Sequence, residues 1–91
     1  MIKHRIEDHF YMLKDKNTGE YVYDEVSYLH GVKFHKTNSL MFAYISGGYC
    51  LEYRAVKNRK KNFEKNYNVE LEIVKIKETK IYEEVESYED K

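Results

Sequence analysis

Basic side chains gather in one segment of a chain whose formal net charge at pH 7 is zero. Residues 54–65 contain a single acid, Glu64, and six basic residues: Arg54, Lys57, Arg59, Lys60, Lys61 and Lys65. In a helix, which turns about 100° per residue, one stripe would be shared by Arg54, Lys57, Lys61 and Lys65. Such a stripe could dock on a partner of opposite charge or track a nucleic-acid phosphate backbone. The alternative is a solvated helix face, because nucleic-acid-binding domains are usually basic overall and this chain is not.

Acidic side chains gather at the opposite end of the chain, where residues 78–91 hold six acids and two lysines. Five of these acids could occupy a basic groove on another protein in place of nucleic acid: Glu83, Glu84, Glu86, Glu89 and Asp90. Complementary charge would also speed such an encounter. The alternatives are a solubilising terminus, or a tail that folds back on the basic helix or on a neighbouring copy.

The other reactive or metal-binding side chains do not form a site. His4 and His9, like His30 and His35, are five positions apart, which puts each pair on opposite faces of a strand or about 140° apart on a helix. Cys50 follows two glycines at a predicted helix start, where a thiolate would be stabilised, but no residue supplies an oxyanion site. The alternative reading of this cysteine is a small buried hydrophobe. We therefore predict a protein that is not an enzyme and has no catalytic residue, metal or cofactor.

Length and composition indicate one small domain. The chain has 91 residues, of which 42% are hydrophobic, enough for a single core. Its one cysteine excludes an internal disulfide. No apolar run is long enough to cross a membrane, and the first residues do not resemble a signal peptide. We expect one domain over residues 1–91, with 78–91 as a candidate acidic tail, in the cytoplasm (the host-cell cytoplasm if the protein is viral).

The elements that must position these charges begin with a β-hairpin. Phe10–Leu13 and Glu20–Tyr23 are rich in aromatic residues, which favour strands. Between them, Asn17 and Gly19 favour a tight turn. A third extended piece is predicted at Tyr28–His35.

One broken helix or two helices are expected in the middle of the chain. Thr37, Asn38 and Ser39 can cap a short helix over Leu40–Ile45, which the following two glycines end or separate from the next helix. The spacing predicts a helix from Tyr49 to about Asn66, with a core-facing stripe formed by Tyr49, Tyr53, Val56 and Phe63.

The chain closes with an extended segment. Val69–Ile73 alternates apolar and acidic residues, as a half-buried strand does. The alternation shifts by one residue at Val74, which indicates either a bulge or a strand covered on both faces. Residues 80–88 fit a helix, a short strand or a tail. The predicted fold is α+β: an N-terminal β-hairpin or meander, one or two helices, and a closing antiparallel strand that pairs with the hairpin and packs on the helix through Val69, Leu71 and Ile73.

The turn region Leu13–Tyr21, the mid-chain helix and the closing Val69–Val74 together resemble small accessory or host-takeover proteins of phages of A+T-rich Gram-positive bacteria. The resemblance implies a non-enzymatic protein that binds, and often inhibits, a host target, including defence systems such as CRISPR nucleases. No functional residue carries over from it.

We therefore expect a small phage-encoded binding protein that inhibits a host macromolecule through charge-complementary surfaces. Its partner would be a host protein or a protein–nucleic-acid complex, and no membrane is expected to take part. The alternative is a nucleic-acid-binding module that uses the basic helix 54–65.

Overall fold

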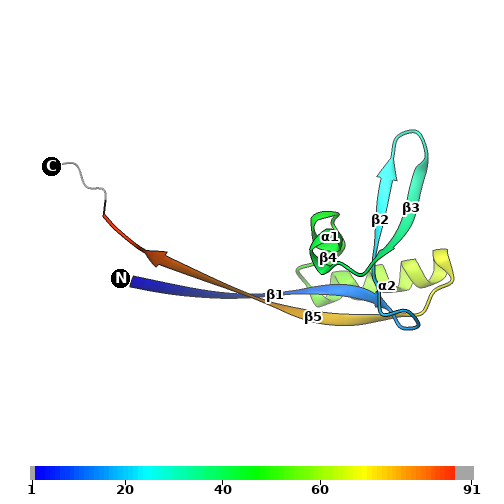
Figure 1. The fold of residues 1–91 in the computed structure, drawn as a ribbon. Coiled ribbons are helices and arrows are strands. Elements are labelled where there is room, and N and C mark those ends of the chain that lie inside the picture. Colours follow the sequence, from blue (N-terminus) through cyan, green and yellow to red (C-terminus); the bar gives the residue numbers. More distant parts are fainter. Residues whose placement is uncertain (1, 88–91) are drawn as a thin grey trace.

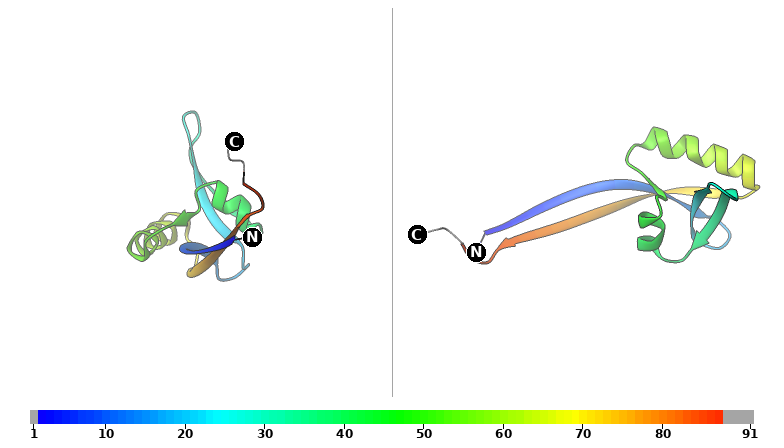
Figure 2. Two further views of the ribbon diagram at one scale, coloured as in Figure 1. Left: turned by 90° about the vertical axis from the view of Figure 1, so that its left-hand side faces the viewer. Right: turned by 90° about the horizontal axis from the view of Figure 1, so that it is seen from above.

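Two long strands form a ribbon that runs the length of the molecule. In the computed structural model, which describes residues 2–87, β1 (Ile2–Asp15) pairs antiparallel with β5 (Leu71–Glu84) along the 14 residues of each strand, without a slip in register. One half of the ribbon lies in the body of the molecule. The other half, residues 2–8 and 78–84, projects from the body as an arm (Figures 1 and 2). The arm accounts for the long axis of 62 Å, against 30 and 23 Å in the other directions.

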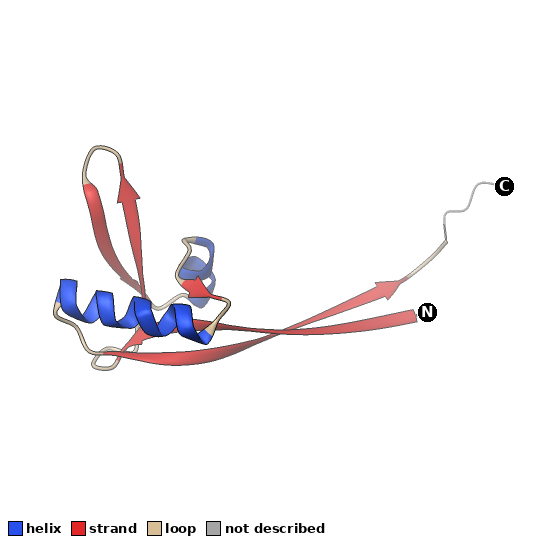
Figure 3. Ribbon diagram, turned by 180° about the vertical axis from the view of Figure 1, so that it is seen from behind, coloured by secondary structure: helices blue, strands red, loops and turns tan. Residues whose placement is uncertain are grey.

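The remaining strands meet β1 on its other edge. β2 (Tyr21–Ser27) shares one register pair with β1, Lys14↔Tyr21, and then pairs with β3 (Gly31–Thr37) along its 7 residues. The short strand β4 (Tyr49–Cys50) pairs with β1 close by. β2 and β4 therefore share one edge of β1 at different positions, β3 lies outside β2, and β5 occupies the other edge of β1 (Figure 3). The α+β class and the closing strand that pairs with the N-terminal strand are therefore confirmed.

The predicted N-terminal hairpin is confirmed at its turn, but its strands soon part. Gly19 has a φ of +74°, and the Asp15 amide donates a hydrogen bond to the Glu20 carbonyl at 2.8 Å. Beyond this turn β2 leaves β1 and pairs with β3. The third extended piece starts at Gly31 and not at Tyr28, because residues 28–30 form the turn between β2 and β3.

The first helix begins and ends as predicted. α1 covers Leu40–Ile45, and the Oγ of Ser39 caps it by accepting a hydrogen bond from the Phe42 amide at 3.1 Å. Gly47, with a φ of +84°, takes the chain out of the helix. A side chain at Gly48 would meet the Ala43 carbonyl oxygen, 2.9 Å from the position of its Cβ, so only glycine fits where the chain crosses α1.

The second helix starts later than predicted. α2 covers Tyr53–Tyr67, and the predicted start at Tyr49 is wrong, because Tyr49 and Cys50 form β4. The Tyr49 ring stacks on Tyr44 with 4.4 Å between ring centroids, a contact made from the sheet. Tyr53 also departs from the predicted core stripe: it is half exposed at the first turn of α2.

α1 and α2 lie on opposite sides of the body half of the ribbon (Figure 2), and a hydrophobic cluster lies under each helix. Under α2, the buried side chains are Leu13, Val22, Val56, Phe63 and Leu71. Under α1, they are Phe10, Met12, Tyr23 and Ala43. Adjacent residues of β1 serve different clusters because alternate positions of a strand point to opposite faces.

β5 is likewise covered on both faces where its alternation shifts. Leu71 and Ile73 pack in the α2 cluster, whereas Val74 and Ile76 pack in the α1 cluster. The register with β1 continues unbroken through these residues, so the strand has no bulge there. Of the two alternatives drawn from the sequence, a strand covered on both faces is confirmed, and so is the packing of the closing strand on α2.

Asp15 organises the turn that follows β1. Its Oδ1 accepts hydrogen bonds from the amides of Asn17 at 2.7 Å and Thr18 at 3.2 Å, and its Oδ2 lies 2.7 Å from the Lys36 Nζ. The side chain is buried, unlike every other acid among residues 2–87. These bonds, the one to Lys36 first, hold the pKa of the Asp15 carboxyl below its ordinary value.

We expect this carboxylate to contribute to the acid sensitivity of the fold. A group whose pKa is depressed by folding stabilises the native state above its unfolded-state pKa, about 3.9, and the contribution is lost as the pH falls through the folded-state pKa. Asp15→Asn should therefore be less stable than the wild type at neutral pH, and the difference should shrink below about pH 4. Urea unfolding at a series of pH values measures it. A difference that stays constant down to the lowest pH would contradict this role for Asp15.

Candidate functional site

The four basic residues predicted to share a stripe lie together on the exposed side of α2. We call them the basic stripe: Arg54, Lys57, Lys61 and Lys65. Val56 and Phe63 mark the buried side of the same helix, so the stripe faces nearly the opposite way. Among residues 2–87, none of the four side chains forms a hydrogen bond or an ion pair. The stripe is therefore a row of solvated cations on an anchored helix.

The other two basic residues of the segment hold the fold together. Arg59 donates to the Asp24 Oδ1 and to the Gly47 carbonyl, each at 2.9 Å, and its guanidinium lies 5.3 Å from the centre of the Phe63 ring. It thus ties α2 to β2 and to the turn after α1. The helical pattern placed Arg59 outside the stripe but did not show these contacts.

Lys60 has a similar structural role at the opposite flank of α2. Its Nζ lies 3.1 Å from the Glu64 Oε1, while the Glu64 Oε2 accepts a hydrogen bond from the Leu71 amide at 3.1 Å. The bond from Leu71, followed by that from Lys60, lowers the pKa of Glu64. The single acid of the basic segment therefore joins α2 to the first residue of β5.

The acidic residues predicted as a second surface are spread along and beyond β5. Glu83 and Glu84 are in the arm, where Glu83 forms an ion pair with Lys3 at 3.3 Å. Glu86 follows the end of β5, and Glu89 and Asp90 lie outside the described residues. Pairing with β1 carries residues 78–84 away from α2 (Figure 1), so this part of the chain does not fold back on the basic stripe.

The histidines and the cysteine occupy separate positions. His4 and His9 are on opposite faces of β1, and the His35 ring stacks on Tyr23 with 5.2 Å between centroids. Cys50 is in β4, not at a helix start, and packs half-buried against the α2 cluster. Within residues 2–87, no three His, Cys, Asp or Glu side chains are grouped so that they could hold a metal ion.

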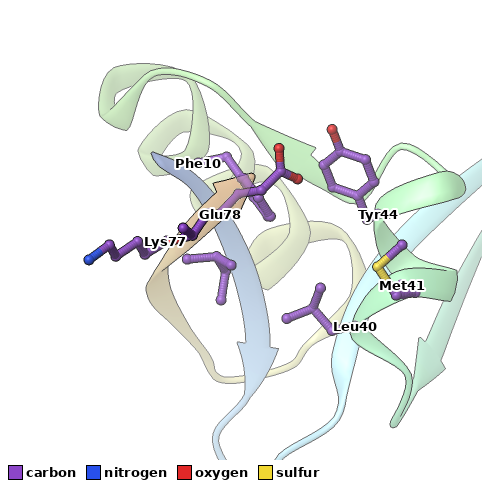
Figure 4. Close-up of a pocket in the computed structure, with 8 residues that line it drawn as sticks. Phe10, Leu40, Met41, Tyr44, Lys77 and Glu78 are labelled. Carbon is purple, nitrogen blue, oxygen red and sulfur yellow. The ribbon is translucent and has the colours of Figure 1, made fainter. Parts of the chain in front are cut away.

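Sequence reasoning missed an apolar surface on α1. The helix consists of six residues without a charge, and a helix this short cannot turn all of them inward. A groove of about 330 Å³ runs between α1 and the start of the arm, and Phe10, Leu40, Met41 and Tyr44 line it together with residues 76–79 (Figure 4). The absence of any charged residue between 40 and 45 was the signal that could have found this surface.

The turn between β2 and β3 is a second surface that the sequence analysis did not single out. Tyr28 is fully exposed there, and Leu29 is 88% exposed. An apolar pair of this kind at the tip of a projecting hairpin contributes nothing to either cluster.

Comparisons with protein-family models, with curated proteins and with solved structures gave no significant match. In the part of the chain that the structure describes, neither helix combines the length and the apolar character needed to cross a bilayer.

Proposed function

We propose that this chain is a small non-enzymatic binding protein that docks on an acidic surface of a macromolecular partner through the basic stripe. The observation that carries the proposal is the division of the basic segment: Arg59 and Lys60 are bonded within the fold, whereas the four stripe residues are exposed and, among residues 2–87, unpaired. Because these four side chains form no ion pair with the described residues of the fold, they are available to bind acidic groups of a partner.

The helix also holds the stripe in a fixed geometry. Arg54 and Lys65 are eleven residues apart in sequence, which corresponds to about 16 Å along a helix axis. Phe63 and Val56 anchor the opposite side of α2 in the core, so the backbone that carries the cations does not have to be ordered on binding. A neutral domain with one local cationic row suits an acidic patch on a protein better than a long nucleic-acid backbone.

The resemblance to small phage proteins favours a host protein, or a protein–nucleic-acid complex such as a CRISPR nuclease, that this chain inhibits in the host-cell cytoplasm. Inhibition would follow from occupation of a surface that the host protein needs, since no step of catalysis is required of this chain.

A nucleic-acid-binding module is the second candidate. Asn58 and Asn62 are exposed beside the basic stripe and offer amide groups that can hydrogen-bond to phosphates or bases. In that case the stripe would follow a phosphate backbone, and binding would weaken steeply with salt.

The test compares two double variants with equal changes in net charge. Lys57→Glu/Lys61→Glu reverses the centre of the basic stripe, and Lys16→Glu/Lys33→Glu changes two exposed lysines elsewhere. Tagged proteins are used to capture host proteins and are also passed over DNA and RNA columns at low salt. We expect the stripe variant to bind the captured partner at least roughly tenfold more weakly than the wild type, with the control variant unchanged.

Three other results would lead to a different conclusion about how this chain binds its partner. Equal loss of binding in both double variants would show that net charge, and not the stripe, attracts the partner. Salt-sensitive retention on nucleic acid that only the stripe variant loses would favour the second candidate. Full partner binding by the stripe variant would contradict both.

A further inference from the structure

The arm leaves one edge of β1 open. Residues 2–10 of β1 pair with β5 on one side only, and within the described residues the opposite edge meets no strand until β4 pairs at Tyr11 and Met12. An exposed strand edge presents unpaired amide and carbonyl groups that can template another strand. A two-stranded ribbon without further support is also marginally stable in water. The arm therefore has unpaired backbone groups along this edge, and pairing with a further strand would stabilise it.

The order of charges along this edge is self-complementary. Residues 4–8 read His4, Arg5, Ile6, Glu7 and Asp8: two basic groups, an apolar residue and two acids. When this segment is laid antiparallel against itself with Ile6 opposite Ile6, each Arg5 faces a Glu7 and each His4 faces an Asp8. Directly opposite residues in an antiparallel pair have their Cβ atoms about 5 Å apart, and opposite charges there are favourable.

We infer that the occupant of this edge is a second copy of the chain, which pairs through residues 4–8 about a twofold axis at Ile6. The two arms then form one four-stranded sheet, in the order β5-β1-β1-β5. The register is well specified, because a shift of the axis by one residue puts Arg5 opposite Arg5 or Glu7 opposite Glu7.

Within one copy, Arg5 and Glu7 already form an ion pair at 2.8 Å, and in the proposed pairing each would also face its counterpart from the second copy. Asp8 is directly opposite Glu78 on the partner strand β5, an unfavourable pair of like charges. His4 of the second copy would lie next to Asp8 and offer it a donor. Ile6, which is 46% exposed in one copy, would be covered by its counterpart.

The outer edge of β5 fits a second copy less well. If two copies of β5 paired antiparallel along this edge, a twofold axis at Lys80 would place two lysines opposite each other. An axis at Ile81 would place Glu78 opposite Glu84. Centring the axis on Thr79 places Glu78 opposite Lys80, a favourable pair, but leaves Lys77 opposite Ile81 and extends the pairing beyond the arm to residues of the body such as Ile76. The register on β1 needs only residues that project from the body.

The test is the oligomeric state of the full chain and of charge-reversed variants, measured by sedimentation equilibrium. A wild-type dimer of the 11.1 kDa chain is expected. Arg5→Glu and Glu7→Arg each turn two favourable cross-strand pairs into two repulsive ones, and each should raise the dimer dissociation constant by about tenfold or more.

Mixing the two variants separates cross-strand pairing from a general effect of charge. An equimolar mixture of Arg5→Glu and Glu7→Arg should form heterodimers, because the first variant has an acid at both positions and the second has a base at both. Every facing pair across the axis then joins opposite charges. The double variant Arg5→Glu/Glu7→Arg should dimerise as the wild type does.

A cross-link tests the register independently of charge. In a Cys50→Ser background, Ile6→Cys should form a disulfide-linked dimer on mild oxidation, since the two sulfurs would lie opposite each other across the axis. Thr79→Cys in the same background is the control for the edge of β5. Far-UV circular dichroism checks that each variant is folded. A wild type that sediments as a monomer at all concentrations, a mixture that does not restore dimers, or cross-linking through Thr79→Cys alone would overturn the inference.

Discussion

Phe63→Ala is expected to lower the free energy of unfolding by about 3–5 kcal/mol, which is a large part of the whole stability of a domain of this size. Phe63 is 5% exposed and lies at the centre of the α2 cluster. Its ring meets Phe34 edge-on at 5.7 Å and Tyr67 edge-on at 5.6 Å, so it connects α2 to β3 as well as to the ribbon. Removing the ring leaves a cavity and also removes the face on which the Arg59 guanidinium rests.

Urea unfolding followed by far-UV circular dichroism measures the loss. Phe63→Leu keeps most of the apolar volume and should cost clearly less. Tyr28→Ala, which removes a fully exposed aromatic ring, should change stability by no more than about 0.5 kcal/mol. Because α2 carries the basic stripe, Phe63→Ala should also weaken partner binding, whereas Tyr28→Ala tests whether the hairpin tip takes part. Similar stability for Phe63→Ala and Tyr28→Ala would contradict the packing described for α2.

Met12→Ala is expected to cost about 2–5 kcal/mol through the other cluster. Met12 is completely buried in the ribbon, opposite Val74 of β5 and Tyr49 of β4, on the face that α1 covers. Truncation opens a cavity between α1 and the sheet. Since β1 is paired on both edges at this point, the backbone has little freedom to close it.

The chain offers a matched control for this variant. Met41 is on α1 and is 60% exposed, so Met41→Ala should cost no more than about 1 kcal/mol in the same urea titrations. The basic stripe is anchored by the other cluster, so partner binding per folded molecule should be unchanged in Met12→Ala. If the two methionine variants were equally stable, the second cluster would not be part of the core.

The local elements of the body could be predicted because their residues carry clear local signals. Ser39 caps α1, Gly19 allows the turn after β1, and Val56 and Phe63 recur at helical spacing. Each of these signals depends on neighbours within a few residues. They were sufficient for the α+β class and for the face of α2 that packs on the sheet.

The arm could not be predicted, because its residues are exposed on both faces. Residues 3–9 and 79–84 are all exposed, so they carry no alternation of apolar and polar positions. Their strand structure comes from pairing with each other across the whole length of the chain. The start of α2 was also misplaced because of a long-range contact. Tyr49 fits a helical stripe by spacing, but it lies in β4 and pairs with Met12 of β1.

The basic stripe, without Arg59 and Lys60, was predicted from the sequence, but the contacts of these two residues were not. Helical periodicity placed the four stripe residues together and exposed them on one side. It did not show that Arg59 meets Asp24 from β2 or that Lys60 meets Glu64 beside the start of β5. Such pairings depend on how α2 lies on the sheet, which a helical wheel does not contain.

Acetylation rates of individual lysines, measured by mass spectrometry on the free chain and on its complex with the captured partner, test the central claim most directly. In the free chain, Lys57, Lys61 and Lys65 should react faster than Lys60, whose ammonium is held by Glu64. In the complex the three stripe lysines should be protected, while Lys16 stays reactive. Stripe lysines that react equally fast in the free chain and in the complex would contradict the account.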